Sequence, residues 1–291
     1  MAIHAHFLHN GRILDSGTPV LFAGQIGLLA GWGVFTTLRI ARGVPFAWER
    51  HWARMERDAR LLNVSMPAKA SDVERDVLRL IEANGRPDCT CRVVVVRNRG
   101  GMWEGPGAES GTDLIALTAD SKEWGESVRL GIQPNARFAA NEFAGAKILS
   151  WGQNLTWAER AQSQGYDEVV LLNERGQVAE CTSANIFVAS GSDVFTPPLA
   201  DGCLPGITRE VLLEQGQADG VRIMERSLYP DDLYSADEVF ITSTTRDLLP
   251  VREIAGRQLR QSGHVRQKIT TAFRAFVDRD ISGRRLAAAS R

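Results

Sequence analysis

The stretch from Lys147 to Phe187 constrains the fold of this chain more than any other. It opens with a lysine at the start of a predicted helix that runs to Gln162. A glycine turn at Gly165 leads into an apolar strand, and a predicted hairpin follows in which Glu180 occupies the middle of a strand. The stretch therefore combines a predicted helix with predicted strands.

Lys147 is the first candidate functional residue in this stretch. The chain has only four lysines, and Lys69, Lys122 and Lys268 lie in polar or charged surroundings. Lys147 instead follows Phe-Ala-Gly-Ala and precedes Ile-Leu, so its ammonium would be desolvated. Desolvation favours the neutral amine, which is the form that reacts with a carbonyl carbon. The alternative interpretation is a structural lysine whose stem is buried and whose amine reaches water.

Glu180 is the second candidate. A carboxylate in the middle of a strand either faces solvent or holds a cationic group. Without further information, a solvent-facing side chain is the more common case for glutamate. Its spacing from Lys147 bears on the choice. Between the two lie Gly165-Tyr-Asp-Glu168 and Gly176, and Asn185-Ile-Phe187 follows.

This ordered run resembles the class IV aminotransferases, the fold type IV pyridoxal-phosphate enzymes. The family includes branched-chain and D-amino-acid aminotransferases and aminodeoxychorismate lyase. The resemblance implies an α/β (α+β) two-domain fold, with a smaller N-terminal α/β lobe and a larger C-terminal lobe that has a β-barrel-like core. It also implies pyridoxal 5'-phosphate (PLP) as cofactor, Lys147 as the catalytic lysine of its Schiff base and Glu180 as the partner of its pyridine nitrogen. A carboxylate there keeps the nitrogen protonated, so that the ring accepts electrons.

The same resemblance implies a set of phosphate and ring contacts. Arg54 lies on an amphipathic helix, and an arginine fork suits a phosphate dianion. Pro205-Gly206 precedes a helix that opens with Ile207-Thr208, and free backbone N–H groups at such a helix start attract anions. The cofactor-binding residues implied by the family pattern are Arg54, Glu180, Leu204, Ile207, Thr208, Ser243 and Thr244.

Substrate residues are less constrained by the pattern. The strand Gly31–Ile40 resembles the opening strand of the family, with Thr36 where many aminotransferases have glutamate. Phe35-Thr36-Thr37 is similar to the lyases, whereas Gly100-Gly101-Met102 departs from their Gly-Gly-Arg. Aminotransfer to a 2-oxo acid is therefore the first hypothesis, elimination of pyruvate the second and a non-catalytic protein the third. The candidate substrate residues are Arg97, Arg99, Thr36 and Thr245.

Length and composition set the remaining expectations. A chain of 291 residues exceeds the usual single core, and the polar segment 119–126 predicts a division into lobes 1–120 and 127–291. A formal net charge of −1 and the lack of long apolar runs give no reason to expect nucleic acid or membrane as partners. The four cysteines lack metal-ligand spacing and no secretory signal is evident, so we expect no metal site and a cytoplasmic location. The family resemblance also implies a homodimer.

Local patterns predict four further elements. Asn10-Gly11 predicts a hairpin with a type I′ turn, and the pattern from Trp48 to Leu62 predicts an amphipathic helix. Ser71 begins a Ser-x-x-Glu capping box, which predicts the start of a second helix. A last helix is expected at roughly 261–278. The predicted buried face of the first helix consists of Trp48, Trp52, Met55, Ala59 and Leu62.

Overall fold

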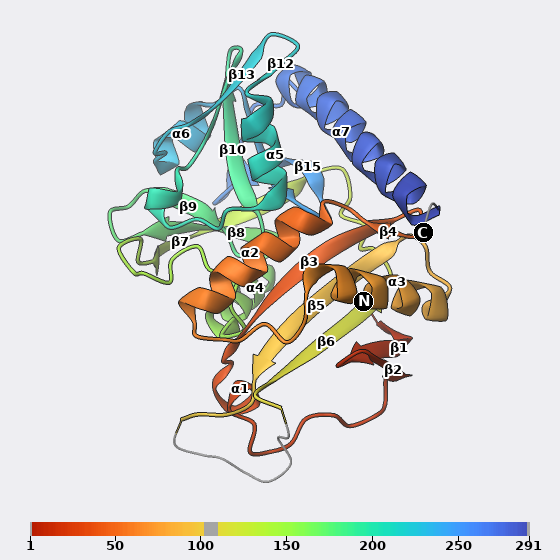
Figure 1. The fold of residues 1–291 in the computed structure, drawn as a ribbon. Coiled ribbons are helices and arrows are strands. Elements are labelled where there is room, and N and C mark those ends of the chain that lie inside the picture. The colour runs from red at the N-terminus through yellow and green to blue at the C-terminus, as the bar shows by residue number, and fades with distance from the viewer. Residues whose placement is uncertain (1, 102–109, 290–291) are drawn as a thin grey trace. The chain divides into compact units, whose positions relative to one another are not determined.

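The computed structural model describes residues 2–101 and 110–289, and the chain forms two compact units. Unit 1 comprises residues 1–122, 147–151 and 278–291, and unit 2 comprises residues 123–146 and 152–277. The short segment 147–151 thus belongs with the N-terminal unit, although it lies far along the chain. Figure 1 shows the helices and strands of both units.

Unit 1 is built on a six-stranded antiparallel sheet. Helices α2 and α3 lie over one face of this sheet (Figure 1). The spatial order of the strands is β2 (Arg12–Asp15), β1 (Ile3–His9), β6 (Thr112–Ala119), β5 (Cys89–Arg97), β3 (Gly33–Ala41) and β4 (Val44–Pro45). The helices are α1 (Ile26–Ala30), α2 (Trp48–Leu61) and α3 (Ala70–Asn84).

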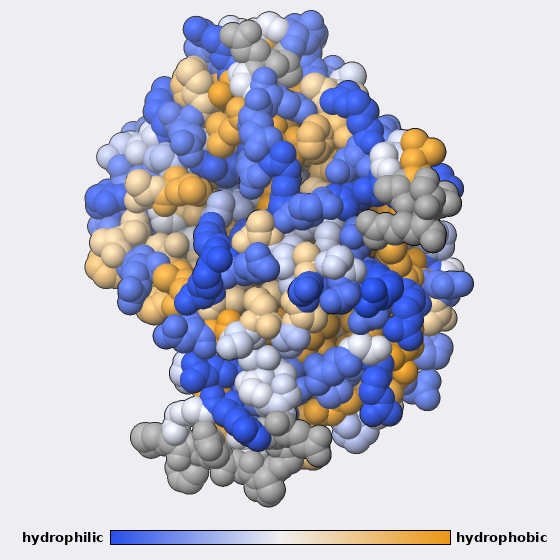
Figure 2. All heavy atoms as spheres, viewed as in Figure 1, coloured by the Kyte–Doolittle hydropathy of each residue, from blue (hydrophilic) through white to orange (hydrophobic). Residues whose placement is uncertain are grey.

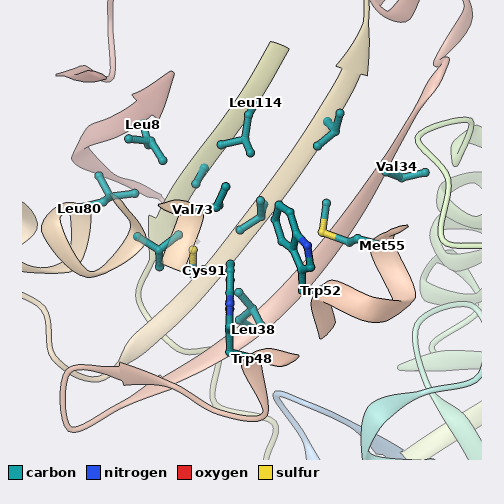
Figure 3. Packing of buried hydrophobic residues seen from close by; sticks show 14 of the residues in the cluster. Leu8, Val34, Leu38, Trp48, Trp52, Met55, Val73, Leu80, Cys91 and Leu114 are labelled. Atoms are coloured by element: carbon teal, nitrogen blue, oxygen red, sulfur yellow. The ribbon is translucent and has the colours of Figure 1, made fainter. Parts of the chain in front are cut away.

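The core of unit 1 lies between the sheet and these two helices. Figure 3 shows Trp48, Trp52 and Met55 of α2 directed toward side chains of the sheet, such as Leu38 and Leu114. The predicted apolar face of α2 is confirmed for Trp48, Trp52, Met55 and Ala59, which are buried, whereas Leu62 is half-buried beyond the helix end. Burying aromatic side chains of this size is a large part of what stabilises a small sheet.

Two of the local predictions for unit 1 can be scored directly. The hairpin of β1 and β2 has positive φ at both Asn10 (47°) and Gly11 (78°), so the type I′ turn is confirmed. The capping box is wrong, because α3 begins at Ala70 after Lys69 and no side chain caps it. Ser71 therefore lies inside the first turn rather than before it.

The predicted helix start at Lys147 is also wrong. The Phe35 N–H donates to the Lys147 carbonyl (3.1 Å), and the Leu149 N–H donates to the Gly33 carbonyl (2.9 Å). Val34 and Ile148 form an antiparallel bridge between these two bonds. The segment is extended because it pairs with the start of β3, a non-local contact that helix periodicity does not reveal.

Unit 2 contains a ten-stranded mixed sheet. Its strands β9 and β10 are joined by the short bend 182–184, yet they occupy the end and the middle of the strand order. The sheet must curl for these two strands to be connected so closely. The order is β12 (Gln217–Ala218), β13 (Val221–Glu225), β11 (Asp193–Thr196), β10 (Asn185–Ser190), β14 (Glu238–Ser243), β15 (Asp247–Ile254), β7 (Val128–Arg137), β8 (Glu168–Asn173) and β9 (Val178–Cys181), with β16 (Arg257–Gln258) beside β15.

Helices complete unit 2, and its core is apolar. Phe187 and Phe240 are fully buried on neighbouring strands, and their rings stack with centroids 5.3 Å apart. The helices are α4 (Gly152–Ser163), the short 3-10 helix η1 (Leu199–Asp201), α5 (Ile207–Gln215), α6 (Pro230–Ser235) and α7 (His264–Ala289), of which residues from 278 onward belong to unit 1. Helix α7 continues beyond the predicted end at 278, where Arg284 pairs with Asp280 one turn earlier and with Glu74.

The surface shows no extensive apolar face in the view of Figure 2, where hydrophilic residues alternate with small apolar groups. Among the described residues, no helix combines the length and the apolar character that a membrane span requires.

Candidate active site

Lys147 is held in unit 1 by its backbone on both sides. Its N–H donates to Oδ2 of Asp58 on helix α2 (3.0 Å), and its carbonyl accepts from Phe35 on strand β3. Asp58 is 1% exposed and also accepts from the guanidinium of Arg57. The backbone at the lysine is therefore fixed between a buried carboxylate and the edge of the sheet.

The Lys147 side chain lies against aromatic rings. Its Nζ is 4.6 Å from the centroid of the Phe35 ring and 6.0 Å from that of Trp151, and these two rings meet edge to face. The guanidinium of Arg92 lies 4.7 Å from the centroid of the same Phe35 ring. Burial lowers the pKa of Arg92 from its ordinary value, although its charge persists. Arg92 was not predicted from the sequence, where it reads as one of many strand arginines.

Thr36 lies at the centre of a buried polar network in unit 1. Its Oγ1 accepts from Nη2 of Arg54 (3.1 Å) and lies 2.7 Å from Nδ1 of His51. All three side chains are at most 7% exposed, and they connect strand β3 to helix α2. The structure thus brings together two predicted residues, Thr36 and Arg54, through a histidine that the sequence analysis did not select.

The charge state of His51 follows from its surroundings. Burial lowers the pKa of His51 well below its ordinary value of 6.5, and the nearby charges of Arg54 and Lys147 lower it further. A neutral imidazole can accept a hydrogen bond at Nδ1, and the Thr36 hydroxyl can donate it while accepting from Arg54. Both Thr36 contacts are therefore compatible with a neutral His51 imidazole beside the Arg54 guanidinium.

The predicted substrate arginines lie at the end of β5 (Arg97) and just beyond it (Arg99). Arg97 donates to the carbonyls of Arg99 (2.8 Å) and Asn63 (2.9 Å), and its guanidinium stacks 4.0 Å from the Trp32 ring centroid. Arg99 is exposed. Residues 102–109, which include part of the loop 97–105, lie outside the described residues.

Glu180 in unit 2 uses both carboxylate oxygens. Oε1 accepts from Nε of Arg137 (3.1 Å), and Oε2 accepts from the backbone N–H of Leu204 (3.0 Å). Both side chains of the ion pair are largely buried, and the Arg137 guanidinium also lies 5.7 Å from the ring centroid of Trp157. Glu180 is therefore a paired carboxylate, and the sequence analysis missed its arginine.

Helix α5 begins without a side-chain cap. Gly206 is its N-cap residue, and Ile207 and Thr208 form its first turn, where backbone N–H groups have no partner within the helix. Thr208 is 1% exposed, and its Oγ1 has no hydrogen-bond partner within residues 2–101 and 110–289. A buried hydroxyl without a partner is costly, so the Thr208 hydroxyl is a candidate for a hydrogen bond to a ligand.

The start of α5 lies next to the end of strand β14. A Cβ atom on Gly206 would come within 2.0 Å of Oδ1 of Asn185, so the two residues are in close contact. Asn185 pairs with Thr242 on β14 and donates to the Leu204 carbonyl (2.9 Å). The α5 N-terminus, Leu204 and the end of β14 are thus joined through one asparagine side chain.

The turn after β14 carries the remaining predicted residues. Ser243 ends the strand and pairs with Asp247, so that residues 244–246 form the turn. Oγ of Ser243 lies 3.4 Å from Oγ1 of Thr245, and Thr242 Oγ1 is buried without a partner in the described part of the chain. Two orphaned hydroxyls, on Thr208 and Thr242, therefore occur in these adjoining segments.

Comparison with known proteins identifies the family. The family model for amino-transferase class IV matches residues 33–254, which is most of the chain. The chain belongs to the class IV aminotransferases. It is an enzyme of this class and has the fold type IV architecture. The predicted family, the predicted fold class and the predicted enzyme class are confirmed.

Proteins similar to this chain have related but different activities in their names. A protein of Methanocaldococcus jannaschii, provisionally named a branched-chain-amino-acid aminotransferase, is 30% identical over 91% of this chain and 94% of its own length. The D-alanine aminotransferase of Bacillus licheniformis is 27% identical over 93% of this chain and 96% of its own length. The crystal structure of a branched-chain aminotransferase from Thermoproteus uzoniensis with norvaline has a TM-score of 0.84 at 26% identity, covering 94% of this chain and 95% of that one.

Proposed function

We propose that this class IV aminotransferase moves an amino group between an amino acid or amine and a 2-oxo acid, with PLP bound covalently through Lys147. The observation that carries the proposal is the placement of Lys147 in unit 1. Its backbone is fixed by Asp58 and Phe35, and its amine lies against the Phe35 and Trp151 rings. A lysine fixed in this way delivers its amine to one position.

The residues of unit 2 fit the cofactor phosphate. The uncapped start of α5, the orphaned Thr208 hydroxyl and the close contact of Gly206 with Asn185 together suit an anion that accepts several hydrogen bonds. We propose that Ile207, Thr208, Ser243 and Thr244 bind the phosphate together with Arg54. Leu204 would pack on the ring, as its position beside Glu180 suggests.

When bound, PLP supplies an aldehyde that condenses with amines and a ring that accepts electrons from the substrate carbon. Glu180 would hold a proton on the ring nitrogen, and the hydrogen bond from Arg137 orients its carboxylate. The Lys147 amine would move a proton between the substrate Cα and the carbon of the PLP aldehyde group, which is the shift that amino transfer requires. Arg92 presents a permanent positive charge at the Phe35 ring that Lys147 also contacts, which suits a substrate carboxylate. Thr245, Arg97, Arg99 and Thr36 remain proposed substrate residues.

The proposal is tested by trapping the covalent link. Purified protein should show a PLP absorbance band that shifts on adding an amino donor. Borohydride reduction should attach the cofactor to Lys147, as located by peptide mass. Lys147→Ala should lose both the link and the activity, whereas Lys69→Ala, at an exposed lysine, should keep both. A reducible link of normal yield in Lys147→Ala would refute the assignment.

Elimination of pyruvate is the second candidate reaction, because Phe35-Thr36-Thr37 resembles the lyases. Release of pyruvate from aminodeoxychorismate without any 2-oxo acid would establish it. A strict requirement for a 2-oxo acid acceptor would establish transfer. A panel of D- and L-amino acids and amines, read at the cofactor band, would then define the donor and its stereochemistry.

We propose further that the enzyme works in the cytoplasm as a homodimer. The four cysteines are free and buried, which suits a reducing compartment. Light scattering of the purified protein measures its mass in solution, and a monomeric mass in the active enzyme would refute the dimer.

A further inference from the structure

Arg246 carries a buried guanidinium on the turn between β14 and β15. The Arg246 side chain is 5% exposed, and it donates to the carbonyl (2.8 Å) and the Oγ (2.9 Å) of Ser183. It also lies 3.4 Å from both Ser243 Oγ and Glu168 Oε2. One side chain thus connects its own turn to the bend between β9 and β10 and to the start of β8.

Glu168 completes the charge balance of this cluster. It is equally buried, and it accepts hydrogen bonds from the hydroxyls of Thr182 and Ser183 (2.6 Å for Ser183). Burial lowers the pKa of Arg246, whereas the neighbouring carboxylate of Glu168 counteracts this effect. A buried ion pair seldom adds net stability, because both charges lose their hydration, so such a pair is better explained by the geometry that it fixes.

Trp124 holds the same turn from the segment before β7. Its ring centroid lies 3.7 Å from the Arg246 guanidinium carbon, and its Nε1 donates to the Thr245 carbonyl (3.0 Å). Asp247, the first residue of β15 after the turn, has φ of 55°, a backbone conformation that side chains rarely adopt. Contacts from Trp124 and from Ser183 therefore hold the turn from two sides.

We propose that Arg246, together with Glu168 and Trp124, is a positioning residue that holds the Ser243–Thr245 turn in the shape that binds the cofactor phosphate. This inference rests on the proposed function, because it assumes PLP at the turn. Arg246 itself need not touch the cofactor: its partners are Ser183, Glu168, Ser243 and the Trp124 ring. A positioning role of this kind predicts that loss of Arg246 weakens binding of the cofactor phosphate and leaves binding of the cofactor ring unchanged.

The experiment compares the affinities of the apoenzyme for PLP and for pyridoxal, which lacks the phosphate. Their ratio is the phosphate preference, and both are measured by absorbance titration. Arg246→Met should lower this preference about tenfold, since one hydrogen bond to a charged group is worth at least that factor. Arg246→Lys should recover only part of it, because one ammonium cannot reproduce the fork of contacts.

Two further variants separate positioning from folding. Trp124→Phe keeps the ring beside Arg246 and removes only the bond to the Thr245 carbonyl, so it should lower the preference several-fold in a folded protein. Arg284→Met is the matched control, because Arg284 is also largely buried but pairs with Asp280 and Glu74 in unit 1. It should leave the preference unchanged.

The outcomes are distinct. A phosphate preference that survives in both Arg246→Met and Trp124→Phe overturns the inference and leaves the proposed function intact. Equal weakening of PLP and pyridoxal also overturns it, since that pattern reports a general loss of structure. Wild-type enzyme that binds neither compound would refute the proposed function, and this inference with it.

Discussion

Replacing Thr36 by valine tests the buried network that links strand β3 to helix α2. Valine keeps the branched shape of threonine and removes only the hydroxyl group. The 2.7 Å contact with His51 and the 3.1 Å bond from Arg54 both disappear. Thr36 is 1% exposed, so water cannot replace the hydroxyl without opening the core.

The expected cost follows from the two groups left behind. A buried polar group without a partner costs about 1–3 kcal/mol, and the cost is larger when that group is charged. Arg54 has further interactions that lessen its share. We therefore expect Thr36→Val to lower the free energy of unfolding by about 2–3 kcal/mol. Thr37→Val is the control, because Thr37 is half-buried on the opposite face of the strand, and it should change stability by less than about 0.5 kcal/mol.

Urea unfolding of the apoenzyme, followed by tryptophan fluorescence, is the appropriate assay. Five of the seven tryptophans belong to unit 1, so the signal reports mainly on the unit that contains Thr36. Circular dichroism follows both units in parallel and detects separate transitions. Equal stabilities of Thr36→Val and Thr37→Val would show that the hydroxyl does not satisfy His51 and Arg54 in the core.

Three further perturbations follow from the structure. Because the pKa of His51 is lowered in the folded state, the unfolded chain takes up a proton on this side chain below pH 6.5 and the folded chain does not. The free energy of unfolding should therefore be highest above that pH and fall by up to about 1.4 kcal/mol per pH unit below it. Unfolding at about pH 7.5 and about pH 5.5 measures this slope, which His51→Gln should remove. Gly206→Ala should weaken PLP binding at least about tenfold in a titration, because its Cβ would collide with the Asn185 amide. Phe240→Ala should cost about 3–5 kcal/mol in urea unfolding, because it removes one of two stacked, fully buried rings and leaves Phe187 beside a cavity.

The features of the fold that could be predicted from the sequence are those that depend on residues close together in the chain. The run from Lys147 through Glu180 to Phe187, the Asn10-Gly11 turn and the apolar face of α2 could all be recognised from neighbouring residues. Contacts between distant segments could not. The extended conformation at Lys147 depends on pairing with β3, more than a hundred residues earlier, and periodicity carries no information about such a partner.

Buried charges were the second kind of residue that the sequence could not place. Pattern analysis assigns charged positions of an amphipathic helix to solvent, yet Asp58 on α2 is 1% exposed. Arg137 and Arg246 were also missed. Each is buried beside a carboxylate, Glu180 or Glu168, that lies on a strand distant in the sequence. A pairing of this kind leaves no signal in either sequence segment alone.

The choice between arginine and lysine is consistent with these burial patterns. Only four of the 34 basic residues are lysines, and Lys69, Lys122 and Lys268 are exposed. Buried cationic positions such as Arg54 and Arg246 carry guanidinium groups, which keep their charge and bond several oxygens at once. Lys147 is half-buried, and an amine there can lose its proton, as a guanidinium cannot. Arginine thus serves where the fold needs a permanent charge, and lysine occurs below the surface at the position where the proposed chemistry needs a neutral amine.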